Sequence, residues 1–147
     1  MIQSKFDTLP KLFPKLFPNP NIDISVGEGW YDIVHDLCAL IQDRIDGREM
    51  YLEQYPEKRD TVRSIPQVEI GQIKQKFGQL RFYYAGGDDY IDGMVGMAGA
   101  VAYKMCEVCG KPGELDGGGW LMILCEEHKK QRQQENEELD ALYADDE

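Results

Sequence analysis

The chain has 147 residues, 42% of them hydrophobic, and a formal net charge of −11. This length supports one domain of ordinary size, or a small domain with an added metal module, and it is sufficient to bury a core. No run approaches the roughly 18 apolar residues of a membrane span, and the opening residues MIQSKFDTLP lack the apolar run of a signal peptide. We therefore expect a cytoplasmic protein with no membrane partner.

Prolines dominate the first segment. KLFP occurs twice, at 11–14 and 15–18, with Pro10 before and Pro20 after, so no helix or strand can run far. We expect residues 1–28 to form an extended Pro-rich arm. Its Leu and Phe side chains are too apolar to remain in water, and we favour packing on the protein's own surface over docking on a partner.

A core helix is predicted over residues 29–45, where apolar residues recur at intervals of three and four. His35 lies beside this stripe, where a boundary imidazole is favoured over a catalytic one. Cys38 lies within it, where a small buried thiol is favoured over a reactive one. The charged stretch that follows predicts a short helix ended by Pro56 and then a loop to Pro66.

Between residues 67 and 84 the apolar period changes to two, which predicts a strand with a bulge at Gly71 and a second strand after Gly78. Four basic residues against one acidic residue give 63–84 a net charge of +3. Lys74, Lys76, Arg81 and Tyr83 are candidate contacts for a nucleic acid or another partner, because cations interleaved with aromatics can form a stacking platform. A half-buried sheet with a wet outer face explains the same alternation, and we favour it.

The segment from residue 88 to 103 predicts a helix with an apolar side that leads directly into the next motif. Asp88 or Asp89 can cap its first turn. The sequence GGDD at 86–89 also suits phosphate or metal chemistry, but two acids after glycines more often begin a helix.

Four residues near the C-terminus have the spacing of a tetrahedral zinc site. Cys106 and Cys109 form CxxC, fifteen residues intervene, and Cys125 and His128 form CxxH. Gly110 can take the positive φ that turns the backbone under a metal. Three glycines at 117–119 predict a hairpin turn, and a helix is expected to follow.

Knuckle, hairpin and helix occur in this order in treble-clef zinc folds, and the likeness covers roughly residues 104–143. A structural zinc is favoured over a catalytic one, because four protein ligands leave no open position. Treble clefs also underlie HNH nucleases, which use a histidine on the hairpin. No histidine lies between Cys109 and Cys125, so we expect no enzyme activity and no catalytic residues.

The end of the chain is acidic. From Glu126 onward nine acids oppose three bases, a net of −6 and more than half of the total charge. A solvated helix with a frayed tail explains this and is favoured. The alternative is a surface for a basic partner, with Glu135, Glu138, Asp145 and Asp146 as candidate contacts.

The motifs KFGQLRFYY, CEVCGKPG, GGW and LCEEH, in this order after GWYDIVHDLCALI, resemble a family of small uncharacterised proteins from bacteriophages, prophages and bacteria. The likeness spans about residues 29–128. It implies a phage or prophage context, hence the host bacterial cytoplasm, and a C-terminal zinc module, but no activity. The KLFP repeat and the acidic tail depart from the family pattern.

Together these features predict an α+β protein in which a small antiparallel sheet packs with helices and a treble-clef-like zinc module ends in a helix. We divide the chain into an arm (1–28), an α+β core (29–103) and a zinc module with an acidic helix (104–147). The function expected is non-catalytic binding of a host or phage protein, for instance inhibition of a host defence or host factor. The alternative is a nucleic-acid-binding protein that uses the basic hairpin 63–84, with Lys104, Lys111, Lys129 and Lys130 near the zinc.

Overall fold

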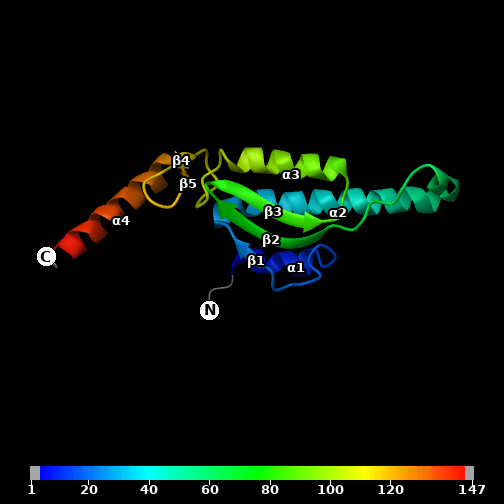
Figure 1. Ribbon diagram of the computed structural model, residues 1–147, viewed down its shortest axis with the longest axis horizontal. Coiled ribbons are helices and arrows are strands. Elements are labelled where there is room, and N and C mark those ends of the chain that lie inside the picture. The colour runs from blue at the N-terminus through cyan, green and yellow to red at the C-terminus, as the bar shows by residue number, and fades with distance from the viewer. Residues whose placement is uncertain (1–3, 145–147) are drawn as a thin grey trace.

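The computed structural model describes residues 4–144. The protein is α+β, as predicted: helices pack on a three-stranded sheet, and a two-stranded hairpin with a final helix forms the C-terminal end (Figure 1). The helices are α1 (Leu9–Leu12), α2 (Tyr31–Gln54), α3 (Asp89–Ala102) and α4 (Glu126–Ala144), with 3-10 turns η1 (Lys5–Thr8), η2 (Glu28–Trp30) and η3 (Pro56–Asp60). The strands are β1 (Asp23–Ser25), β2 (Glu69–Lys76), β3 (Gln79–Ala85), β4 (Glu114–Asp116) and β5 (Met122–Leu124).

The predicted basic hairpin is present as β2 and β3. Phe77 and Gly78 turn the chain with φ angles of 57° and 77°, the left-handed values of a two-residue type I′ loop. The pairing register shifts between Ile70 and Gln72, which places the predicted bulge at Gly71.

The three-stranded sheet is mixed rather than antiparallel, because β1 joins β2 in parallel. Asp23 pairs with Gln72 and Ser25 pairs with Lys74. This strand corrects the prediction of an antiparallel sheet. Three residues between a proline-rich turn and a glycine carry no strand period of their own, so the contact with β2 decides their conformation.

The N-terminal arm is compact rather than extended. Ser4 and Asp7 form a capping box at η1, and Pro10 lies in the first turn of α1, where a missing N–H costs no hydrogen bond. The Leu16 carbonyl accepts a 2.8 Å hydrogen bond from the Ile70 N–H. The arm packs on its own domain, and its buried side chains are Phe6, Leu9, Leu16 and Phe17.

Helix α2 continues to Gln54, past the predicted end at residue 45. The added residues are charged, but Arg, Glu, Met and Leu are good helix formers, and Leu52 is fully buried. The helix ends before Pro56, which cannot extend it. Although α2 and α4 are long, no helix among residues 4–144 is apolar enough to cross a membrane.

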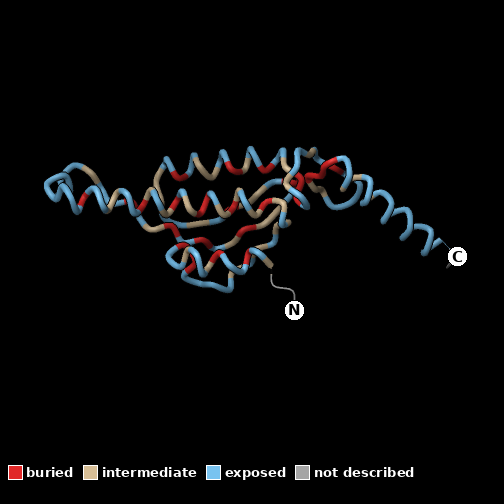
Figure 2. The backbone as a smooth tube through the Cα atoms, turned by 180° about the vertical axis from the view of Figure 1, so that it is seen from behind, coloured by how far each residue is buried: buried red, intermediate tan, exposed pale blue. Residues whose placement is uncertain are grey.

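The layers follow from the apolar faces of these elements. Helix α2 packs across one face of the sheet, and α3 lies beside α2 along β3 (Figure 1). Their shared core includes Leu37, Ile41, Ile73, Phe82 and Ile91. Figure 2 shows the buried positions concentrated in this body, whereas α4 projects from it and contains no buried residue.

Asp88 caps α3, as predicted. Its carboxylate accepts a 3.0 Å hydrogen bond from the Ile91 N–H and a 2.8 Å bond from Arg44 on α2. The hydrogen bond and positive charge of Arg44 hold the pKa of Asp88 below its usual value. Within GGDD, the Asp88 carboxylate therefore has a structural role, since it joins α2 to the start of α3.

Candidate metal centre

The first two ligands lie on a tight turn between α3 and β4. The Gly110 N–H donates to the Cys106 carbonyl at 2.8 Å, and Gly110 has a φ of +79°. The Cys106 N–H donates to the Lys111 carbonyl at 2.7 Å. This turn is the predicted knuckle, and its glycine takes the left-handed conformation that a β-carbon would disfavour.

The hairpin and the last helix position the other two ligands, Cys125 and His128. Leu115 of β4 pairs with Ile123 of β5, and the chain then passes Cys125 into α4. Cys125 immediately precedes the helix rather than lying within it, and its carbonyl accepts the Lys129 N–H at 2.9 Å. His128 lies in the first turn, so both ligands point to the knuckle.

The donor atoms of Cys106, Cys109, Cys125 and His128 all lie within 4.8 Å of one another. The Cys109 and Cys125 sulfurs are 3.7 Å apart, and the His128 Nδ1 lies 3.6 Å from the Cys106 sulfur and 3.2 Å from that of Cys125. A tetrahedral metal about 2.3 Å from sulfur and 2.0 Å from nitrogen separates neighbouring donors by roughly 3.5–3.8 Å. The residues therefore fit one tetrahedral metal ion, and a disulfide, at about 2.05 Å, is not formed.

Cys125 and the core thiol Cys38 lie in opposite surroundings. A backbone hydrogen bond from His128 lowers the pKa of Cys125, which favours the thiolate that binds metals. Burial alone raises the pKa of Cys38 to about 12. Cys38 is fully buried in α2 and matches the expected inert core thiol.

Glu107, which sequence reasoning did not single out, ties the knuckle to the rest of the protein. Glu107 is 2% exposed, and its carboxylate accepts hydrogen bonds from the Ile123 N–H at 2.8 Å and from Gln75 of β2 at 3.1 Å. Burial raises the pKa of this carboxyl, and these donors oppose the shift. Its carbonyl accepts the Gly29 N–H at 2.8 Å. The only sequence feature that could have drawn attention to Glu107 is its place between two ligands in CEVC.

Trp30 makes the second connection. It is fully buried in a cluster with Ala102 and Ile123, and its indole N–H donates to the Met105 carbonyl at 2.9 Å. A β-carbon at Gly29 would collide with the Cys106 carbonyl, so the glycine permits this close approach. The metal centre is thus built directly against the start of α2.

The predicted basic contacts lie on the face of the β2–β3 hairpin opposite the core. Lys74 pairs directly with Arg81, and the Lys74 ammonium lies 5.7 Å from the Tyr83 ring centre. Tyr83 and Phe77 are 45% and 59% exposed. The aromatic residues of the hairpin therefore lie on both faces of the sheet, because Phe82 is buried in the core whereas Tyr83 is exposed. Lys104, Lys111 and Lys130 are exposed around the metal centre, and Lys129 is half-buried.

The predicted acidic contacts lie on α4 or beyond it. Glu135 and Glu138 are exposed on the helix, whereas Asp145 and Asp146 lie outside the described residues. Arg132 holds the first half of α4 to the hairpin through a 2.8 Å ion pair with Asp116, and Asn136 donates to the Gly118 carbonyl at 2.9 Å.

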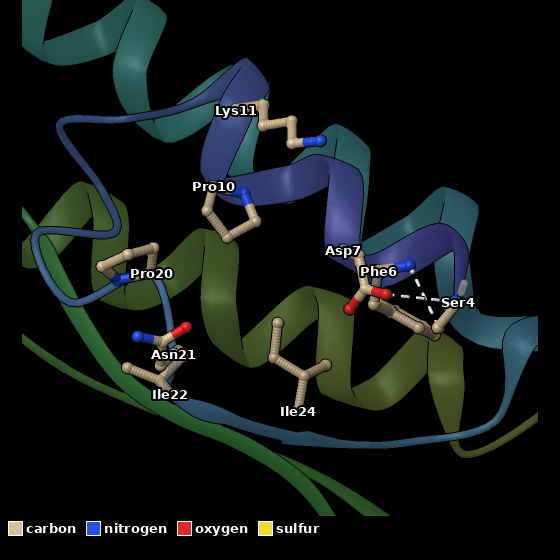
Figure 3. Close-up of a pocket in the computed structure, with 9 residues that line it drawn as sticks. All are labelled: Ser4, Phe6, Asp7, Pro10, Lys11, Pro20, Asn21, Ile22 and Ile24. Atoms are coloured by element: carbon tan, nitrogen blue, oxygen red, sulfur yellow. Dashed lines mark hydrogen bonds between the residues drawn. The ribbon is translucent and has the colours of Figure 1, made fainter. Parts of the chain in front are cut away.

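The polar groups of His35 and of a hollow near the N-terminus are engaged in structural contacts. His35 is hydrogen-bonded to Asp36 at 3.1 Å and packs beside Phe13 and Tyr31, a boundary position as expected. A hollow of ≈ 410 Å³ lies between the first helical turns and β1, and Figure 3 shows the residues that line it. Ser4 and Asp7 line it, but their polar groups satisfy each other's backbone in the capping box.

Comparison with family models, curated proteins and solved structures finds no match for the chain. The resemblance to small phage, prophage and bacterial proteins thus stays a prediction. What the site itself establishes is a Cys₃His cluster with the geometry of a metal centre.

Proposed function

We propose that this protein is a zinc-stabilised, non-catalytic binding protein that recognises a protein partner through the end of α4. Zinc is the metal favoured by three thiolates and one imidazole in a tetrahedral arrangement. With four protein ligands the ion has no open position for a substrate or an activated water. Its role is to hold the base of α4 in place.

The exposed apolar end of α4 carries the proposal. Leu139, Leu142 and Tyr143 are 53%, 68% and 70% exposed. Leu139 and Tyr143 continue the helix face on which Arg132 and Asn136 hold the hairpin, since residues three or four apart share a face. After Asn136 the next residues on this face are apolar, and α4 projects from the body (Figures 1 and 2).

The charges around this apolar end indicate the kind of partner. Glu135, Glu137, Glu138 and Asp140 precede or flank it, and no basic residue occurs from Gln133 to Ala144. A helix of this kind suits an apolar groove with a basic rim, into which its apolar side can be laid. We infer that the partner is a host or phage protein, and inhibition of a host defence or host factor fits the resemblance to phage proteins.

The test is a pull-down from bacterial lysate with the zinc-loaded protein, before and after nuclease treatment. We expect a stoichiometric protein that survives nuclease and is lost when Leu139, Leu142 and Tyr143 are replaced with serine. A variant with Gln134→Ser and Ala141→Ser, on the opposite side of the helix, is the control and should retain it. Equal recovery by both variants would refute α4 as the binding element.

Nucleic-acid binding is the second candidate, and the outer face of the hairpin favours it. Lys74 and Arg81 lie side by side there with exposed aromatics, which is the composition of a stacking platform. Replacing Lys74, Lys76 and Arg81 with glutamine should then abolish binding of single-stranded DNA and flatten its salt dependence. Binding that is indifferent to these replacements would exclude this surface.

A further inference from the structure

Among residues 4–144, β3 is an edge strand, with β2 on one side and no strand on the other. Two contacts show which main-chain groups of β3 face β2 and which face away from it. The Tyr83 carbonyl oxygen lies 3.9 Å from where a β-carbon of Gly71 on β2 would be, and the Leu80 carbonyl oxygen lies 4.0 Å from that of Gly99 on α3. Main-chain groups alternate in direction along a strand. The N–H and C=O groups of Leu80 and Phe82 therefore point away from β2.

These outward groups are open to a further strand. Within residues 4–144 the main chain of Leu80 and Phe82 forms no hydrogen bond with a loop or helix. An unpaired edge of this kind is a template for pairing with another extended segment. Here it faces a groove rather than open solvent.

The groove lies between β3 and α3 and has a volume of ≈ 630 Å³. Helix α3 presents Gly96, Gly99 and Ala100 to the middle of the groove, and Val95 and Tyr103 line it as well. A β-carbon at Gly96 would meet nothing within 4 Å. Small residues therefore keep the space open beside the part of the strand edge that faces Gly96.

The charge of the groove is opposite to that of the protein. Arg81 and Lys104 line it, and no acidic residue does, although the chain carries a net charge of −11. The Arg81 Nε is shielded from solvent and has no hydrogen-bond partner among the described residues. A buried donor without a partner is costly, and a carboxylate is the strongest acceptor for a guanidinium.

We propose that β3 binds an extended acidic peptide, which adds a fourth strand to the sheet in the groove between β3 and α3. Leu80 and Phe82 supply the main-chain hydrogen bonds. Alternate side chains of the peptide face opposite sides of the sheet. One set therefore places carboxylates beside Arg81 on the outer face, and the other set, which is apolar, packs against Leu80 and α3. This surface is separate from α4 and goes beyond the function proposed above.

A peptide fits these features better than a nucleic acid does. Strand addition uses the unpaired N–H and C=O groups of the edge, for which a phosphate backbone has no alternating donors and acceptors. Only two cations line the groove, which is enough for one or two carboxylates but few for a polyanion held by many phosphate contacts.

The probe is a fluorescein-labelled peptide of alternating Glu and Val, titrated with the zinc-loaded full chain and followed by fluorescence anisotropy. We expect saturable binding that is lost when every peptide nitrogen is methylated, since methylation removes the donors but keeps the charges. A matched Lys–Val peptide should not bind. Equal affinity for the methylated peptide would overturn strand addition, and so would failure of the Glu–Val peptide to bind.

Gly96→Leu tests the groove without weakening the helix, since leucine is the better helix former. Its side chain should fill the space beside β3 and weaken peptide binding by about tenfold or more. Gly93→Leu makes the same change one turn earlier, outside the groove, and should leave the affinity unchanged. Arg81→Gln should weaken binding and reduce its salt dependence. Equal affinities of the two leucine variants would overturn the assignment.

Two controls separate this proposal from the others. The serine variant at Leu139, Leu142 and Tyr143 should bind the peptide normally, so failure of the α4 proposal leaves this result untouched. Labelled oligothymidylate competes with the peptide if the groove binds single strands. Tighter binding of oligothymidylate than of peptide, lost steeply with salt, would assign the surface to nucleic acid and overturn the peptide proposal.

Discussion

The main body and the metal-binding end of this protein are stabilised in different ways. In the body, α2, the sheet and the arm bury a large set of aliphatic and aromatic side chains around Ile41 and Ile73. At the metal-binding end the local cluster consists of Cys106, Leu124 and Cys125, with Met122 partly buried against it. Two of its three buried residues are ligands. Burial of apolar area can hold the body together, whereas the end has only this small cluster to bury.

The contrast also explains how a long helix can leave the body. A helix normally gains its stability by packing an apolar face, and α4 has no buried residue. Its base instead carries two residues of the Cys₃His cluster, and an ion pair from Arg132 and a hydrogen bond from Asn136 hold it to the hairpin. The free part can therefore present Leu139, Leu142 and Tyr143 to a partner without loss of the fold.

Loss of the metal should have the largest effect. Replacing Cys106 and Cys109 with serine should abolish the proposed zinc binding and loosen residues 104–144, because metal binding by such sites contributes roughly 10 kcal/mol to local folding. Hydrogen exchange should rise across β4, β5 and the start of α4, while α2 and β2 remain protected. The metal content is measured in parallel. One tightly bound zinc per chain with an unchanged melting curve would contradict the assignment of these ligands.

Trp30→Ala tests whether the two regions are coupled, and it should weaken both. Loss of a fully buried tryptophan costs about 3–5 kcal/mol, and the Met105 carbonyl beside the knuckle also loses its donor. Thermal or urea unfolding should show the decrease, together with faster zinc release to a chelator. Trp120→Ala is the control, since Trp120 is 68% exposed and should change stability by less than about 0.5 kcal/mol. Zinc release at the wild-type rate would show that the regions are not coupled through Trp30.

What the sequence predicts well is what lies within a short stretch of chain. The spacing of Cys106, Cys109, Cys125 and His128 names the metal ligands, and alternation around Gly71 predicts the bulged hairpin. Both depend on local geometry that the residues themselves impose. The capping role of Asp88 follows in the same way.

The features that the sequence did not predict are made by contacts between distant segments. β1 is a strand only because β2 lies beside it. Glu107 is buried because Gln75 and the Ile123 N–H converge on its carboxylate, and no pattern within CEVC specifies those partners. The groove beside β3 is formed by α3, which lies close to the strand through Gly96, Gly99 and Ala100, and no local sequence pattern specifies that neighbour.

Asp88→Ala tests a connection within the body, where a smaller effect is expected. Loss of the N-cap should cost about 1 kcal/mol, measured by urea unfolding, without change in zinc content. The folded-state pKa of Asp88 lies below the ordinary value of 3.8, so the ionised carboxylate stabilises the fold above about pH 4. This stabilisation is lost as the pH falls below 3.8 and through the folded-state pKa. The variant should therefore lose less stability than the wild type on acidification. A parallel decline of the two would contradict this role.

Cys38→Ala should have the smallest effect and sharpens the contrast between the two kinds of cysteine. The Cys38 side chain is fully buried in α2, and burial raises its pKa to about 12, so the thiol stays protonated and unreactive at neutral pH. The substitution should cost no more than about 1 kcal/mol and leave zinc content unchanged. In the wild type, iodoacetamide should modify the three ligand cysteines once a chelator has removed the metal, and Cys38 only after denaturation. Modification of Cys38 in the folded protein would mean that the body is as open as the metal-free end, and the comparison between the two regions would fail.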